Sequence, residues 1–133
     1  MGAGGESFGR EAQLTRMPGI SIHVVDVTRG VPARGMRVEI HRIDDAGRHL
    51  VARGEVGADG VVAHPVTTGA GIVPGRYDIE LAAGAFYRAL DVDVGAPAFL
   101  EIAAFRFTVV DTTEHYHLPV KLSPWGFSIW RGR

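Results

Sequence analysis

Apolar and polar residues alternate along most of the chain from residue 20 onward, which is typical of strands with one buried face. The alternation is clearest at residues 115–122. One set of positions there is apolar throughout: Tyr116, Leu118, Val120 and Leu122. The other set carries two imidazoles, a proline and an ammonium: His115, His117, Pro119 and Lys121. We expect the first set to face a core and the second to face water, a partner or a substrate.

The same reasoning predicts further strands at residues 20–27, 36–43, 50–56, 61–66, 76–81, 91–94 and 99–110. Turns are expected at 44–47 and 58–60, and a turn or loop at 28–32, where Gly, Pro and Asp cluster. Residues 99–110 are largely apolar on both sides, which predicts a strand buried in a sandwich or against a subunit. Residues 82–90 are rich in alanine and predict one short helix. About eight short strands and little helix predict an all-β, two-sheet antiparallel β-sandwich.

The composition limits the possible functions. The chain has 133 residues, 46% of them hydrophobic, and a net charge of -1, which fits one globular domain. We expect a disordered tail at 1–19 and the domain at 20–133. Because there is no basic cluster and no apolar run long enough for a signal or a membrane span, we expect no nucleic-acid or membrane partner and a cytoplasmic location. The absence of cysteine excludes disulfides, thiolate metal sites and a cysteine nucleophile.

The candidate chemistry lies in the histidines, since no phosphate-binding loop or nucleophile elbow is present. His115 and His117, with His23, could chelate a metal, but no carboxylate or thiolate stands beside them, so we predict no metal and no other cofactor. Alternatively, the strand histidines are simply solvated. His23 has apolar neighbours and must hydrogen-bond when partly buried, either as a structural or as a functional residue. His41 and His49 are expected to be surface residues.

Two separated motifs resemble the transthyretin-related 5-hydroxyisourate hydrolases. Residues 21–26, Ser-Ile-His-Val-Val-Asp, are similar to that family's Ser-Thr-His-Val-Leu-Asp. Residues 115–119, His-Tyr-His-Leu-Pro, are similar to its His-Tyr-His-Val-Pro, and both are followed by Leu-Ser-Pro. The chain ends in Trp-Arg-Gly-Arg, where the family has Tyr-Arg-Gly-Ser. The turn at 58–60 also fits, and the resemblance spans roughly residues 20–133.

The resemblance implies a transthyretin-like β-sandwich that assembles into a homotetramer, a dimer of dimers with active sites at the dimer–dimer interface. It also implies metal-free hydrolysis of a ring amide in a purine-derived lactam, a small-molecule substrate of urate breakdown. His23 and His117 match the two catalytic histidines. One would act as general base on water, and the other would polarise the carbonyl or protonate the leaving nitrogen. Arg131, with Ser128 and Trp130, would line the substrate site.

Three departures from the family pattern change the expected site. Val61 stands where the family has an arginine that holds the anionic substrate, and losing that charge should weaken anion binding. Trp130 replaces a tyrosine, and Arg133 replaces a serine and could restore a cation if the chain end folds into the site. A first alternative is therefore a diverged member that acts on another ring substrate in a specialised biosynthetic pathway. A second is a non-catalytic carrier, as in transthyretin. Whether Lys121 faces the same channel stays open.

Overall fold

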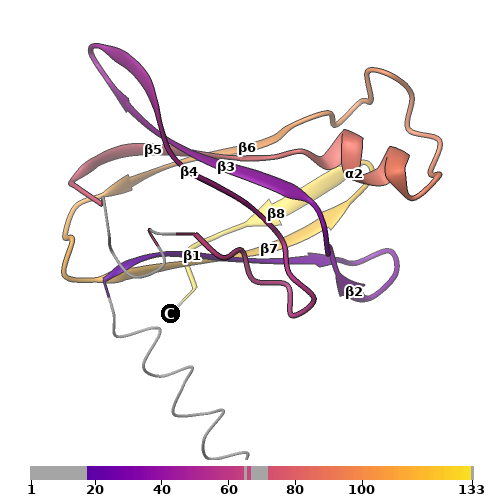
Figure 1. Cartoon of the computed structure of the whole chain (residues 1–133), viewed down its shortest axis with the longest axis horizontal. Coiled ribbons are helices and arrows are strands. Elements are labelled where there is room, and N and C mark those ends of the chain that lie inside the picture. Colours follow the sequence, from indigo (N-terminus) through magenta and orange to yellow (C-terminus); the bar gives the residue numbers. More distant parts are fainter. Residues whose placement is uncertain (1–17, 65, 67–71, 133) are drawn as a thin grey trace, which may run out of the picture.

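The structure is a computed structural model that describes residues 18–64, 66 and 72–132. Two four-stranded sheets face each other across one core (Figure 1). The first sheet has the order β2-β1-β7-β8, and the second has the order β4-β3-β5-β6. The strands of the first sheet are β1 (Gly19–Asp26), β2 (Val31–Pro32), β7 (His115–Ser123) and β8 (Gly126–Ile129). Those of the second are β3 (Arg37–Asp44), β4 (Gly47–Glu55), β5 (Gly75–Leu81) and β6 (Ala103–Val109).

The predicted two-sheet sandwich is confirmed, with one difference in strand direction. β1 and β7 pair in parallel over the whole length of β1, whereas the other strand pairs are antiparallel. Nearly ninety residues of sequence separate the two strands, and this distance allows the chain to cross over and return in the same direction. β1 begins at Gly19, so the described part of the predicted tail already enters the sheet. Residues 1–17 and Arg133 lie outside the described residues.

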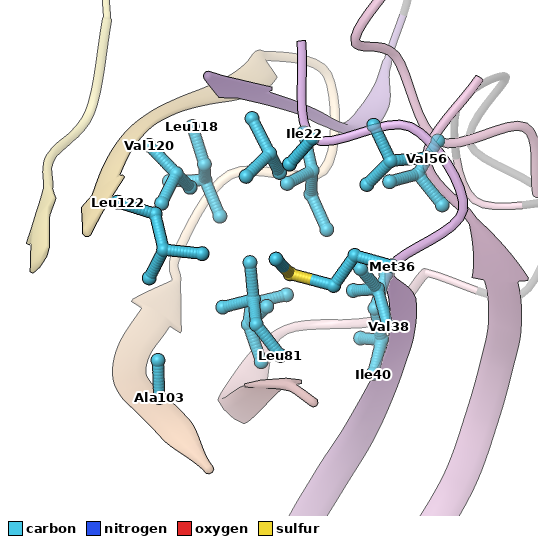
Figure 2. Packing of buried hydrophobic residues seen from close by; sticks show 14 of the residues in the cluster. Ile22, Met36, Val38, Ile40, Val56, Leu81, Ala103, Leu118, Val120 and Leu122 are labelled. Carbon is cyan, nitrogen blue, oxygen red and sulfur yellow. The ribbon is translucent and has the colours of Figure 1, made fainter. Parts of the chain in front are cut away.

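The core lies between the two sheets, as the alternating pattern predicts (Figure 2). Leu118, Val120 and Leu122 of β7 are at most 1% exposed, and they point toward the opposite sheet. Val38, Ile40 and Leu81 meet them from β3 and β5 (Figure 2). Burying an aliphatic side chain of this size contributes roughly 1.5–3 kcal/mol. The opposite face of β1 and β7 is therefore the face that remains for function.

The short helix predicted at 82–90 is α2 (Ala83–Ala89), and side-chain bonds tie it to the first sheet and to the following loop. The hydroxyl of Tyr87 donates to Asp26 Oδ1 over 3.0 Å. Burial alone would raise the pKa of Asp26, but donors from Thr28, Arg29 and Tyr87 outweigh it and hold this pKa below its usual value. Burial and the Asp26 carboxylate both raise the pKa of Tyr87. None of the described helices is long and apolar enough to cross a membrane.

Three of the predicted strands differ from the structure. Of the strand predicted at 61–66, residue 65 lies outside the described residues, and the others form no strand. Val61 and Val62 make isolated bridges only, because their partners are the single residues His23 and Val56. Residues 91–94 also form no strand, since the backbone N–H groups of Asp91 and Val92 bond back to carbonyls of α2.

β6 begins at Ala103 rather than Phe99, which is 82% exposed. One face of β6 is exposed within the chain, so the chain itself covers only the other face; burial of the exposed face against a subunit stays a prediction. At 28–32, predicted as turn or loop, the last two residues form β2.

Candidate functional site

The candidate histidines lie on the outer face of the first sheet, away from the core. The parallel register pairs Ser21 with His117 and His23 with Pro119. Paired residues share a face, so Ser21, His23 and His117 all point outward from the sandwich. Along neighbouring strands, the two histidines are offset by two residues, which corresponds to about 7 Å along the strand and about 5 Å across. A small ring compound can contact both imidazoles at this separation.

Ser21 links two histidines of β7. Its Oγ lies 2.7 Å from His117 Nδ1 and also 2.7 Å from His115 Nε2. Ser21 and His115 are both only 8% exposed, so the expectation that the polar side of β7 is solvated is wrong for His115. A hydroxyl has one proton to donate, so Ser21 donates to one ring nitrogen and accepts from the other when each histidine is neutral. The result is a continuous His115–Ser21–His117 hydrogen-bond chain, which sequence spacing alone could not reveal.

His23 is anchored from the opposite side by the turn at 58–60. Its Nε2 lies 3.1 Å from the carbonyl oxygen of Asp59. Because a carbonyl only accepts, Nε2 carries the proton, and in the neutral ring Nδ1 carries the lone pair. Gly60 follows with φ +88°, and a Cβ on it would lie 2.7 Å from His23 Nε2. Only glycine both adopts this backbone conformation at low cost and leaves room for the ring.

Val61 lies directly beside His23. The two residues form an isolated antiparallel bridge, and both are partly buried. The neighbouring backbone bond from Val24 N to Gly60 O, 2.9 Å long, holds the turn against β1. An isopropyl group therefore stands next to His23, and it supplies no hydrogen-bond donor and no charge.

The chain end passes across His117. The backbone N–H of Gly132 donates to the carbonyl of His117 over 2.7 Å, and a Cβ on Gly132 would lie 3.1 Å from His117 Cδ2. Earlier in the same segment, Trp130 is 42% exposed, and Lys121 Nζ lies 5.9 Å from the centroid of its ring. Ser128 pairs with Lys121 across β7 and β8 and is also exposed. Ser128 and Trp130 thus both lie beside Lys121, which shares the outer face of the first sheet with His23 and His117.

The contacts of Arg131 are with its neighbours near the start of β7. Its guanidinium carbon lies 4.2 Å from the ring centroid of Tyr116, and Nη2 lies 3.4 Å from both Glu114 Oε2 and the carbonyl of His115. Arg131 Nε is buried and has no hydrogen-bond partner. The charge of Arg131, a residue predicted to line the substrate site, is therefore compensated by the Glu114 carboxylate and by the face of the Tyr116 ring. Arg133 lies outside the described residues.

Two further features were not singled out by sequence reasoning. Ligand atoms of Glu39, His41 and Glu80 lie within 4.8 Å of one another on the second sheet, a grouping able to hold a metal ion. Arg48 Nη2 lies 2.8 Å from His41 Nδ1 and 3.1 Å from Glu80 Oε1, so a guanidinium already supplies positive charge there. Burial lowers the pKa of His64 to about 4. The alternating pattern placed His41 on a surface but could not show which residues of β5 lie beside it.

The whole domain matches one protein family. Residues 20–132 match the HIUase/Transthyretin family. The chain belongs to this family. The 5-hydroxyisourate hydrolase 2 of Rhizobium meliloti is 38% identical over 113 residues, which are 85% of this chain and 94% of that protein. The 5-hydroxyisourate hydrolase of Pseudomonas aeruginosa is 34% identical and covers 85% of this chain and 90% of that one. These relatives are hydrolases, in agreement with the predicted enzyme class.

Solved structures are similar to the same domain. Klebsiella pneumoniae 5-hydroxyisourate hydrolase aligns with a TM-score of 0.72 and 26% identity over 88% of this chain and 100% of that chain. An (S)-allantoin synthase aligns with a TM-score of 0.78 and 28% identity over 90% of this chain, but this chain covers only 45% of it. The transthyretin-like fold predicted from the two motifs is confirmed by these similarities.

Proposed function

We propose that this protein is a metal-free hydrolase that opens a ring amide of 5-hydroxyisourate, using His23 and His117. The observation that carries the proposal is that both imidazoles lie on one outer sheet face, each with one ring nitrogen held by a neighbour. An imidazole titrates near neutral pH and can therefore give or take a proton at working pH. The names of the family relatives support the choice of substrate.

His23 would act as the general base. Its Nε2–H donates to the Asp59 carbonyl, so Nδ1 is the atom that can take a proton from water. The water oxygen then attacks the ring carbonyl carbon and forms a tetrahedral intermediate. The Asp59 carbonyl keeps the ring in the required tautomer and stabilises the imidazolium that forms. Gly60 and Val61 hold the ring in place from the side of the turn.

His117 would act as the general acid. It would polarise the carbonyl and then protonate the leaving ring nitrogen as the C–N bond breaks. Ser21 orients its ring through Nδ1 and connects it to His115. His117 then regains a proton from solvent and the proton gained by His23 returns to solvent, so both histidines recover their starting state and one water is consumed. Ser128, Trp130 and Arg131 would border the substrate.

We also propose that the protein is a homotetramer built as a dimer of dimers, that it is located in the cytoplasm, and that it acts in purine metabolism. The site residues lie on the face of the first sheet that points away from the core between the two sheets. A second copy facing this sheet would enclose the substrate and exclude bulk water, while leaving room for the one water molecule that attacks the ring carbonyl. Light scattering should give four times the mass of the chain at micromolar concentration, and a monomer would contradict this arrangement.

The proposal is tested by following the ultraviolet decay of freshly generated 5-hydroxyisourate. We expect the wild-type protein to accelerate the decay, and His23→Ala and His117→Ala each to slow it by at least about a hundredfold. His49→Ala is the matched control, because His49 is 40% exposed and pairs with Asp44 on the other sheet; it should behave as wild type. A wild-type decay equal to that of buffer would reject this substrate.

The presence of valine at position 61 favours one alternative, namely a diverged enzyme that acts on a different ring compound. The isopropyl group beside His23 suits a less polar substrate than an arginine would. Turnover of a neutral cyclic amide or imide that is lost in His117→Ala, with none of 5-hydroxyisourate, would favour this alternative. A carrier function would instead give ligand binding that is unchanged by either histidine substitution.

A further inference from the structure

The outer face of the first sheet carries a third basic group besides the two proposed catalytic histidines. Lys121 pairs with Val25 of β1 and with Ser128 of β8. It lies two residues beyond Pro119, the partner of His23, so Lys121 and His23 point to the same side, about 7 Å apart along the strand direction. Lys121 is exposed and is the single lysine of the sequence.

Two other positions near the histidines could supply a positive charge, but one carries no cation and the other carries a cation that is already paired. Position 61, beside His23, is valine. Arg131 is paired with Glu114 and stacked on Tyr116. Lys121, in contrast, has no carboxylate partner among the described residues, and it lies over the Trp130 ring with Nζ 5.9 Å from the centroid.

The surroundings of Lys121 favour an anion. In the described parts of β1, β7 and β8, the outward positions carry no acidic side chain; they hold Ser21, His23, Val25, His115, His117, Pro119, Lys121, Ser123 and Ser128. The Asp59 carboxylate, near His23, accepts from the backbone N–H of Val61 over 3.0 Å. Because no acidic side chain on this face neutralises it, the compact ammonium group raises the local concentration of anionic ligands.

We propose that Lys121, held against Trp130, binds an anionic oxygen of the substrate and so replaces the charge that Val61 does not supply. The cation–π contact restricts the lysine side chain and leaves ammonium hydrogens available to the ligand. A ring compound whose carbonyl lies between His23 and His117 would extend its anionic edge along β7 toward Lys121. This inference rests on the proposed hydrolase function and adds a residue that determines its specificity.

The kinetic test compares Lys121→Met, Lys121→Arg and the double variant Lys121→Met/Val61→Arg on freshly generated 5-hydroxyisourate. Lys121→Met removes the charge but keeps most of the length of the side chain, and we expect KM to rise about tenfold to a hundredfold with kcat within about threefold of wild type. Lys121→Arg and the double variant should recover most of the affinity. The control Arg53→Met removes an exposed cation of β4 in the other sheet and should leave KM unchanged.

A binding test separates failure of this inference from failure of the hydrolase proposal. Reductive methylation with labelled formaldehyde keeps the lysine charge and gives one dimethyl-lysine NMR signal, because the chain has one lysine. Titration with urate, an anionic purine lactam, should shift this signal in wild type and in Arg53→Met. A shift without turnover would reject the substrate and retain the anion site. A wild-type KM in Lys121→Met, or no shift on titration, would overturn the role of Lys121, provided that light scattering finds the variants in the wild-type oligomeric state.

Discussion

Ser21 and His117 are joined by a 2.7 Å hydrogen bond although 96 positions separate them in the sequence. The parallel pairing of β1 with β7 places them directly opposite each other, and the same Ser21 oxygen reaches His115 on the far side. One hydroxyl therefore links two imidazoles, and its single proton couples their tautomers. The ring proposed as the general acid is oriented by this serine rather than by a carboxylate.

Replacing Ser21 tests this coupling. We expect Ser21→Ala to lower kcat by at least about tenfold, because the His117 ring is no longer held in one tautomer. The limb of the kcat–pH profile that reports His117 should move, which a purely structural role would not produce. Ser21→Thr keeps the hydroxyl and should restore most of the rate and the original profile. An unchanged pH profile in Ser21→Ala would rule out the coupling.

Gly60→Ala tests the close contact between the turn and His23. The new Cβ would lie 2.7 Å from His23 Nε2, so the ring has to move and its bond to Asp59 is disturbed. We expect activity to fall by at least about tenfold, along with a loss of stability of about 1 kcal/mol from the positive φ. Gly35→Ala is a matched control, since Gly35 has φ +91° and a Cβ added there would meet no atom within 4 Å. It should lose similar stability and keep its activity.

Tyr87→Phe should destabilise the fold, because it removes a donor to the buried Asp26 carboxylate. A hydrogen bond to a charged group contributes about 1.5–3 kcal/mol, against about 1 kcal/mol for a neutral one. Tyr77→Phe provides the comparison, since Tyr77 is equally buried and its hydroxyl has neutral partners only: it donates to the Val73 carbonyl over 2.7 Å and accepts from the Val73 N–H over 3.0 Å. Urea unfolding at neutral pH should therefore find the Tyr87 variant less stable than the Tyr77 variant. Equal losses would contradict the charge-assisted assignment.

His64 should make stability depend on pH between about 6.5 and 4. Burial lowers its pKa to about 4 in the folded protein, whereas the unfolded chain has the ordinary value near 6.5. The unfolded state therefore binds more protons in this window, and stability falls as the pH falls through it. At 1.36 kcal/mol per unit the loss is at most about 3 kcal/mol, and partial exposure reduces it.

Two variants isolate the contribution of His64. His64→Gln cannot titrate, so the slope of unfolding free energy against pH should flatten between about 6.5 and 4. Hydrogen bonds from Arg88 and the Ala98 backbone lower the pKa of Glu101 to about 2. The stabilisation that this carboxylate provides is therefore lost mainly below the pH window of His64. Glu101→Gln should therefore leave most of the slope in the His64 window unchanged. If the slope of unfolding free energy against pH persists in His64→Gln, another titratable group causes it.

The sequence by itself determined the fold class, the faces of β1, β3, β5 and β7 that enter the core, and which two histidines are the candidates. Alternation at residues 115–122 predicts the buried set of β7 because a strand repeats every two residues, whatever lies around it. The strand predictions at 61–62 and 91–94 were wrong, since the backbone groups there bond to single distant residues or back to α2.

The tertiary structure alone decided what surrounds each histidine. The register of β1 on β7 joins Ser21 to His115 and His117, the turn at Gly60 closes on His23, and the pairing of β7 with β8 brings Lys121 to the Trp130 side of the site. These contacts connect residues that are far apart in sequence, and they form only when burial of the shared core fixes one strand register. Local pattern identifies which side chains face outward, but only the packed sheets determine which of them meet.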